Sequence, residues 1–234
     1  MEDNFGIDFI LCVFLTIILF IWYFFKYHYK TNMTYVKSSY DNHTYYVRNL
    51  PDKLNAANLL AYIHKMIDVL IERLEIAYPK NAQVLRMKNK FKHCILEESQ
   101  HNTNHTSYSV NKGEKLVFCL RSKTEEQTLV DVNTITFVSL HELAHILSVS
   151  HGHTEEFWNN FRFVLAHAVK WNLYASVDYK TNVKPYCGTQ ITDTPLKIND
   201  IKKFVSFNDK NLDFSTVPIP KSFQLQKPEE IKTE

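Results

Sequence analysis

The first pattern along the chain is an apolar run from Phe9 to Phe25 that carries no charge and one weakly polar residue, Thr16. With the two residues before it, the run gives about 19 residues and about 28 Å of helix, which is enough to cross a bilayer. Acidic residues precede the run and bulky aromatic residues close it, unlike a cleaved signal peptide. Residues 1–30 are therefore predicted to form a retained transmembrane anchor that contacts lipid through residues 7–25.

The charges beside this run indicate an orientation. Lys26 and Lys30 follow the run, and no Lys or Arg precedes it. The positive-inside rule then predicts a single-pass membrane protein whose remaining residues lie on the cytosolic side. Three N-glycosylation sequons, which begin at Asn32, Asn42 and Asn104, would matter only in the opposite orientation.

The next segments differ in their periodicity. Residues 31–50 are polar and aromatic with no sustained period, which indicates a stalk. From Leu54 to Tyr78 the apolar positions follow the three-and-four spacing of a helix, and Pro79 ends it. A second, shorter helix is predicted over residues 82–91.

A strand pattern then replaces the helical one. Residues 106–121 read as a β-hairpin with Gly113 in its turn. A long helix is predicted after the hairpin, with Asp131 or Asn133 as its N-cap and its end near Val149.

The last helix and the tail complete the predicted organisation. Thr154 can cap a helix that runs to about Leu173, with two acidic residues in its first turn. Beyond Pro195 the chain is rich in Lys, Asp and Pro, so residues 197–234 are expected to form a flexible tail. The overall expectation is an α+β fold, in which residues 51–196 form a mainly helical domain with a small β-sheet.

Composition then excludes several classes of protein. A chain of 234 residues fits one compact domain with appendages. Its 27 Lys and Arg against 25 Asp and Glu are too evenly balanced for a protein that neutralises nucleic-acid phosphates, so no strong nucleic-acid signature is present. The four Cys residues are widely spaced and include no CxxC pair, which favours reduced structural thiols over a disulfide framework or a thiolate zinc module.

The segment that carries chemistry is His141-Glu142-Leu-Ala-His145. Two His residues four positions apart share one face of a helix and can bind one tetrahedral cation, and the Glu between them can reach a water on the metal. The host helix is apolar nearly all round, so it is expected to be buried. Buried polar groups without partners are costly, whereas one Zn²⁺ ion would make ligands of both His residues.

A catalytic zinc needs a third protein ligand from outside this helix. His151 and His153 both follow within a short distance, and Gly152 between them gives the backbone the freedom to aim either ring. Spacing alone leaves both candidates open.

The residues from Leu116 to Leu173 resemble the zincin metallopeptidases of the SprT-like and WLM type, including versions in large DNA viruses. In that family the HELAH motif is followed by a short loop, a ligand His, three residues and then Phe or Trp. His153, followed by Phe157 and Trp158, matches this spacing, whereas His151 does not. The resemblance therefore implies a minimal zincin-like domain that uses His153 as third ligand, with His151 as an alternative or supporting residue.

The resemblance also implies where a peptide would bind. An edge strand ahead of the active-site helix pairs with extended substrates in this family, and Lys115 to Arg121 is the matching segment. An ordinary core strand is an equally good interpretation of the same residues. Strand addition would give broad specificity, because main-chain hydrogen bonds do not discriminate between side chains.

Two tyrosines are weaker candidates for a catalytic role. Tyr186 or Tyr179 can donate a hydrogen bond to the oxyanion of a tetrahedral intermediate, and Cys187 can in principle ligate or block the zinc. A packed loop aromatic is the commoner explanation for a Tyr beside a Pro, as Tyr186 is.

The sequence leads to one main hypothesis and one alternative. The main hypothesis is a membrane-anchored zinc metallopeptidase in a viral or host-cell membrane, with a protein or peptide substrate and with Glu142 as general base. The alternative is an inactive, zinc-stabilised scaffold tethered to the membrane. The family's association with proteins crosslinked to DNA is not carried over, because of the membrane segment and the lack of a basic run.

Overall fold

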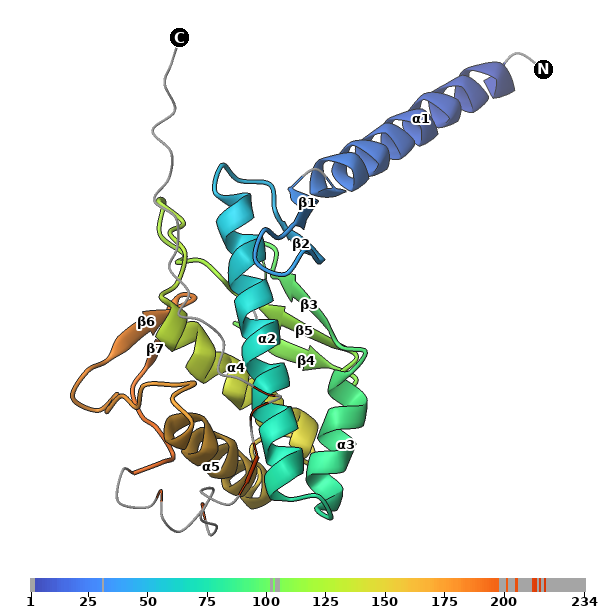
Figure 1. The fold of residues 1–234 in the computed structure, drawn as a ribbon. Coiled ribbons are helices and arrows are strands. Elements are labelled where there is room, and N and C mark those ends of the chain that lie inside the picture. Colours follow the sequence, from blue (N-terminus) through green and yellow to red (C-terminus); the bar gives the residue numbers. More distant parts are fainter. Residues whose placement is uncertain are drawn as a thin grey trace.

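The computed structural model describes residues 3–30, 32–101, 103 and 106–197, together with residues 201, 205, 212, 213, 215 and 217; within the first helix, side chains are described for residues 9–26. The structure is a mixed α+β arrangement in which helices cover a small sheet (Figure 1).

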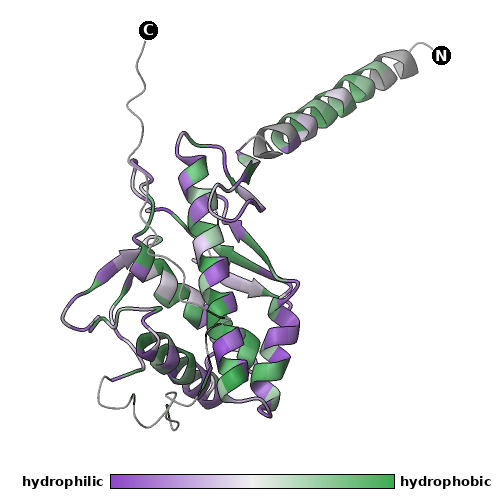
Figure 2. Ribbon diagram, viewed as in Figure 1, coloured by the Kyte–Doolittle hydropathy of each residue, from purple (hydrophilic) through white to green (hydrophobic). Residues whose placement is uncertain are grey.

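The first helix, α1 (Asp3–Lys30), extends away from the rest of the chain (Figure 1). Its 18-residue stretch Phe9–Lys26 is apolar and long enough to cross a bilayer, and 0% of it is buried against the protein. Figure 2 shows this apolar character along the described length of the helix. A surface of this kind is stable only when something apolar covers it.

The main sheet has five strands: β1 (Met33–Lys37), β2 (Thr44–Arg48), β3 (Ile95–Glu98), β4 (Tyr108–Val110) and β5 (Lys115–Phe118). Their order in space is β1-β2-β3-β5-β4. The β1–β2 and β4–β5 pairs are antiparallel hairpins, whereas β3 pairs in parallel with both β2 and β5.

The prediction of a stalk over residues 31–50 is wrong, because β1 and β2 belong to this sheet. Tyr45 and Val47 point into the core and are 4% and 0% exposed. The turn between the two strands is held by Asn58, whose side-chain oxygen accepts hydrogen bonds from the Ser38 hydroxyl and the Ser39 backbone, each at 2.9 Å. Strands of five residues are too short to give a clear period in a sequence rich in Tyr.

The predicted helices are confirmed as α2 (Lys53–Ala77), α3 (Ala82–Phe91), α4 (Val132–Leu147) and α5 (Glu155–Lys170). Of the two candidate caps for α4, Asp131 has the role: its carboxylate accepts the Thr134 N–H at 2.9 Å. The α2 helix lies against the sheet and the other helices, with one face almost wholly buried (Figure 1).

The predicted hairpin is confirmed as β4 and β5, with Gly113 in its turn at φ 111°. The prediction of Lys115–Arg121 as an edge strand is wrong, because β5 is paired with β3 on one side and β4 on the other. The short strand β3 gives no period of its own in the sequence, so nothing there indicates a partner for β5. The outer strand at this side of the sheet is β4.

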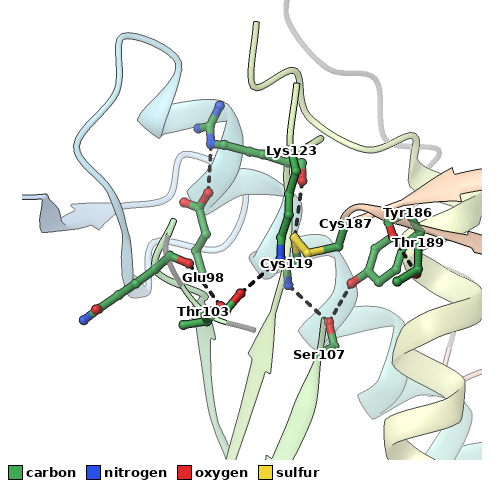
Figure 3. Close-up of a disulfide and its surroundings, with 10 residues drawn as sticks. Glu98, Thr103, Ser107, Cys119, Lys123, Tyr186, Cys187 and Thr189 are labelled. Carbon is green, nitrogen blue, oxygen red and sulfur yellow. Dashed lines mark hydrogen bonds and ion pairs between the residues drawn. A yellow bond between two sulfur atoms is a disulfide. The ribbon is translucent and has the colours of Figure 1, made fainter. Parts of the chain in front are cut away.

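The prediction of reduced thiols is wrong for two of the four Cys residues. Cys119 and Cys187 form a disulfide across 68 positions of the sequence (Figure 3). Cys187 lies in the turn of a separate two-stranded sheet made of β6 (Lys184–Tyr186) and β7 (Thr189–Ile191). Spacing gave no indication of this pair, because the fold alone brings the two segments together. It also removes Cys187 as a candidate zinc ligand.

The predicted flexible tail, residues 197–234, lies mostly outside the described residues. At one described position, Val217 is 6% exposed and its carbonyl oxygen accepts a hydrogen bond from Arg73 Nε at 3.0 Å. At that point the chain therefore contacts α2.

A buried ion-pair network connects the sheet to the start of α2. Arg121 is 3% exposed, and its guanidinium donates to Glu98 at 2.8 Å and to Asp52 at 2.6 Å. The other oxygen of Glu98 accepts the backbone N–H of Arg48 at 2.7 Å. Glu98 thus joins β2, β3 and the segment after β5.

We expect Glu98→Ala to lower the free energy of unfolding by about 3 kcal/mol, because it leaves the buried Arg121 charge short of a partner. Urea unfolding of the full-length protein in detergent measures this change. Glu97→Ala is the matched control: its pair with Lys115 is partly exposed, so its loss should cost less than about 1 kcal/mol. Equal effects of the two variants would contradict the network's role.

Candidate metal centre

Helix α4 carries two histidines and one glutamate into the interior. Most of its side chains are buried, as its nearly uniform apolar sequence predicted. His141 and His145 lie one turn apart on the same face, with ring centroids 5.0 Å apart. Glu142, between them in the sequence, is only 4% exposed. The local helix therefore positions two imidazoles and a carboxyl group before any distant segment contributes.

The loop after α4 is held in place by charged side chains from two other elements. Lys112, in the β4–β5 turn, donates to the carbonyl oxygens of Ser148, Val149 and Ser150. Glu156, in the first turn of α5, accepts the backbone N–H groups of Val149 at 2.8 Å and Ser150 at 2.9 Å. Carbonyl oxygens and N–H groups of this short loop are thereby hydrogen-bonded. These bonds fix the path of the backbone that leads to His153.

This loop brings His153 to the two histidines of α4. The Nε2 atoms of His153 and His141 are 3.1 Å apart, and one nitrogen from each of the three rings lies within 4.8 Å of the others. Nitrogens bound about 2.0–2.1 Å from a tetrahedral zinc lie about 3.3 Å from one another, so the three rings fit such an ion. His151 also faces the same cleft but does not join this group.

One aromatic ring supports all three imidazoles. Phe157 on α5 stacks on His145 at 4.3 Å between ring centroids and contacts His153 at 4.6 Å and His141 at 4.9 Å. Phe157 is fully buried, so its ring cannot turn away. This contact gives a physical reason for an aromatic residue four positions after His153.

Burial sets the charge states of the site. It lowers the pKa of His141 to about 3 and that of His145 to about 4, and neighbouring histidines add to the effect. Both rings are therefore neutral near pH 7, the form that binds metal ions. Burial raises the pKa of Glu142 to about 8, so this carboxyl group can hold a proton near neutral pH.

The histidines and Glu142 face a cleft of about 470 Å³. Residues of β4, the loop after α4 and the β6–β7 hairpin form its other walls. Tyr186 is among the lining residues, and its hydroxyl lies 2.6 Å from Ser107 Oγ. Tyr179 is not: it is fully buried and packs on Phe137. The geometry therefore keeps Tyr186 as a candidate and removes Tyr179.

Sequence reasoning missed several residues of this site. Lys112 and Glu156 hold the loop, and Ser107 and Ser109 of the β4 segment line the cleft. The Ser109 hydroxyl is buried with no hydrogen-bond partner among the described residues. Serines in a polar stretch and charges beside a turn have no spacing that marks them, so no signal in the sequence could have found them.

A second group of possible ligands lies elsewhere, at the turn between β1 and β2. Atoms of Asp41, His43 and His64 come within 4.8 Å of one another. Here the Tyr45 hydroxyl donates to Asp41 at 2.6 Å and lies 3.2 Å from His64 Nδ1. These polar atoms therefore have partners within the turn and in Tyr45.

The WLM domain family matches residues 41–208, and the chain belongs to this family. An uncharacterized protein of Acanthamoeba polyphaga mimivirus is 35% identical over 172 residues, which cover 72% of this chain and 87% of that protein. An uncharacterized protein of Invertebrate iridescent virus 6 is 32% identical over 130 residues, covering 52% and 70% of the two chains. These relatives are viral, as the resemblance implied.

Among solved structures, the crystal structure of Wss1 from Saccharomyces cerevisiae is similar, with 25% sequence identity and a TM-score of 0.40. It covers 54% of this chain and 88% of that chain. Membership of the WLM family supports a metallopeptidase-type function for the chain, and the family implies zinc as its metal.

We expect Lys112→Met to raise the dissociation constant for Zn²⁺ about tenfold, because supporting residues around metal ligands commonly contribute that much. Competition with a chromophoric chelator measures the constant. Lys115→Met is the control, since Lys115 pairs with Glu97 and does not touch the loop. An unchanged constant in Lys112→Met would show that the loop positions His153 without this contact.

Proposed function

We propose that the protein is a membrane-anchored zinc metallopeptidase. The observation that carries the proposal is the convergence of His141, His145 and His153 beside the buried Glu142 at the floor of an open cleft. This donor set of three imidazoles leaves a fourth tetrahedral position for water or substrate.

In this proposal His141, His145 and His153 hold the ion. The chemistry that these residues would gain from a bound zinc ion is Lewis acidity, which would polarise a scissile carbonyl and make a water molecule more acidic. The Glu142 carboxylate removes a proton from the attacking water and later delivers it to the nitrogen of the leaving amine. Glu142 is only 4% exposed, and burial raises the pKa of its carboxyl group. A raised pKa helps the group to accept the proton and then to hold it until it is delivered.

The remaining walls of the cleft are assigned to the substrate. The Tyr186 hydroxyl, held by Ser107, is proposed to donate a hydrogen bond to the oxygen that becomes negative during hydrolysis. The outer strand β4 is proposed to pair with an extended peptide through its backbone. In this proposal β4 is the strand that pairs with the substrate, whereas the sequence led us to expect this role for the segment that forms β5.

We expect Glu142→Gln to retain about one zinc per chain and to lower kcat/KM for casein or a peptide by at least about 100-fold, as loss of a general base does. His145→Ala should lose the metal. Atomic absorption and a cleavage assay on the full-length protein measure both, and the exposed Glu155→Gln serves as the control.

Two results would reject the peptidase. Wild-type protein without stoichiometric zinc would exclude the metal centre altogether. Wild-type protein that holds zinc and hydrolyses no peptide would leave the alternative, a zinc-stabilised scaffold tethered to the membrane.

The membrane anchor is the second part of the proposal, and it is supported by the exposure of every described side chain from residue 9 to residue 26. Orientation with the domain on the cytosolic side, from Lys26 and Lys30, stays a prediction. A viral or host-cell membrane is the expected location.

We expect the full-length protein to stay with membranes through alkaline carbonate extraction. The double variant Leu15→Arg with Ile18→Arg should be extracted, because each Arg at the centre of a span costs about 2.5–3.5 kcal/mol. The apolar pair Leu15→Phe with Ile18→Phe controls for altered shape. Retention of the Arg variant would mean that α1 does not cross the bilayer.

A further inference from the structure

The β6–β7 hairpin forms part of the cleft wall and contacts the rest of the fold through side chains: Tyr186 and Cys187 are buried in the core, and Ile191 packs against it. Its strands pair only with each other, in a sheet of their own. Among the described residues, no backbone hydrogen bond joins residues 184–191 to the main sheet or to a helix. An isolated two-stranded hairpin is at best marginally stable in water, so side-chain contacts must hold this one in place.

Two connections tie the hairpin to the segment around β5, and they lie side by side (Figure 3). One is the Cys119–Cys187 disulfide, and the other is the hydrogen bond between Tyr186 and Ser107. The same Ser107 oxygen accepts the backbone N–H of Cys119 at 3.1 Å. Cys119 is therefore linked to the hairpin both covalently and through Ser107.

The turn of the hairpin is built around Cys187. The two residues between β6 and β7 are Cys187 and Gly188, with φ values of 48° and 77°. Two-residue turns of this kind favour Asn, Asp or Gly, because other residues adopt positive φ at a cost. A Cys at the first position goes against that preference, and the disulfide accounts for its presence. A Cβ on Gly188 would lie 3.0 Å from the Lys123 side chain, so the turn also packs closely.

Tyr186 precedes Cys187 and connects this turn to the catalytic centre. The ring is 4% exposed, lines the same cleft as Glu142, and lies close enough to interact electrostatically with that carboxylate. Thr189 and Ile191 of β7 line the cleft as well. Displacement of the hairpin would thus remove Tyr186 and one wall of the substrate site together.

We propose that the Cys119–Cys187 disulfide is a redox-sensitive clamp that holds Tyr186 in the catalytic cleft, and that reduction to two thiols lowers peptide hydrolysis by releasing the hairpin. The inference rests on the proposed peptidase function. Cys119 and Cys187 are positioning residues in it, since neither lines the main cleft.

The chemistry of the switch is a two-electron exchange. The disulfide accepts two electrons and two protons and becomes two thiols, while a phosphine reductant becomes its phosphine oxide with an oxygen taken from water. In cells, thiols of the glutathione class perform the same reduction and become a disulfide themselves. A reducing cytosol therefore favours the released hairpin, and an oxidising compartment favours the clamped form.

The test compares full-length, zinc-loaded protein in detergent before and after complete reduction by the phosphine. We expect kcat/KM for a peptide to fall about 100-fold or more, as loss of one oxyanion donor does, with zinc content unchanged. The double variant Cys119→Ser with Cys187→Ser should match the reduced protein and ignore the reductant. Because Cys119 and Cys187 are only 6% and 3% exposed, the reductant reaches the disulfide slowly. The double variant avoids this difficulty, since it contains no disulfide to reduce.

Two further variants distinguish the proposed redox-sensitive clamp from a general loss of stability on reduction. Cys94→Ser, at the free buried thiol, should respond to the reductant as wild type does. Tyr186→Phe should lose activity while oxidised and should lose less than about threefold more on reduction, because the clamp acts through the hydroxyl that this variant lacks. Full reductant sensitivity in Tyr186→Phe would overturn the role of Tyr186.

The remaining outcomes distinguish the two proposals. If oxidised wild type hydrolyses peptide and reduction leaves kcat/KM unchanged, the redox inference is wrong and the peptidase function stands. If neither form hydrolyses peptide although zinc is bound, the peptidase function itself is wrong. Loss of zinc from wild type on reduction, matched by low zinc content in the double Ser variant without reductant, would assign the disulfide to metal retention and overturn the clamp.

Discussion

The structure depends on the cost of placing polar side chains in an apolar interior. Helix α4 buries Glu142 and brings His141 and His145 into the same region, where water cannot fully solvate them. The rest of the domain places a third imidazole, that of His153, next to the first two and leaves a cleft above them. A metal ion would turn this unfavourable cluster into a set of ligands.

The three histidines are held in place by residues that are not candidate metal ligands themselves. Lys112 and Glu156 bond opposite polar groups of one loop, and Phe157 supports three rings at once. Lys112 comes from the β4–β5 turn, whereas Glu156 and Phe157 both come from α5, so the turn and the helix must both be formed before His153 has its direction. Metal binding and folding are therefore coupled through this loop.

The wall opposite the histidines is organised differently. It includes a short hairpin that one disulfide and one hydrogen bond, both beside Ser107, join to the segment around β5 (Figure 3). Tyr186 and Cys187 of this hairpin also pack into the core. The floor of the cleft belongs to helix α4, whereas this wall belongs to a sheet that is separate from the main one among the described residues.

The sequence by itself determined what local rules can specify: the apolar helix of residues 9–25, the later helices with the Thr154 cap, the Gly113 turn and the spacing of His141, Glu142 and His145. Tertiary structure brought His153 to the other two histidines, as the family resemblance implied, and selected Asp131 over Asn133 as the cap of α4. It also made strands of the expected stalk, put β4 rather than β5 at the edge, and joined Cys119 to Cys187. Local patterns depend on neighbours within a few residues, so they can be predicted from the sequence. Strand order, disulfide partners and the direction of a loop depend on segments brought together by burial of a shared core, which no spacing records.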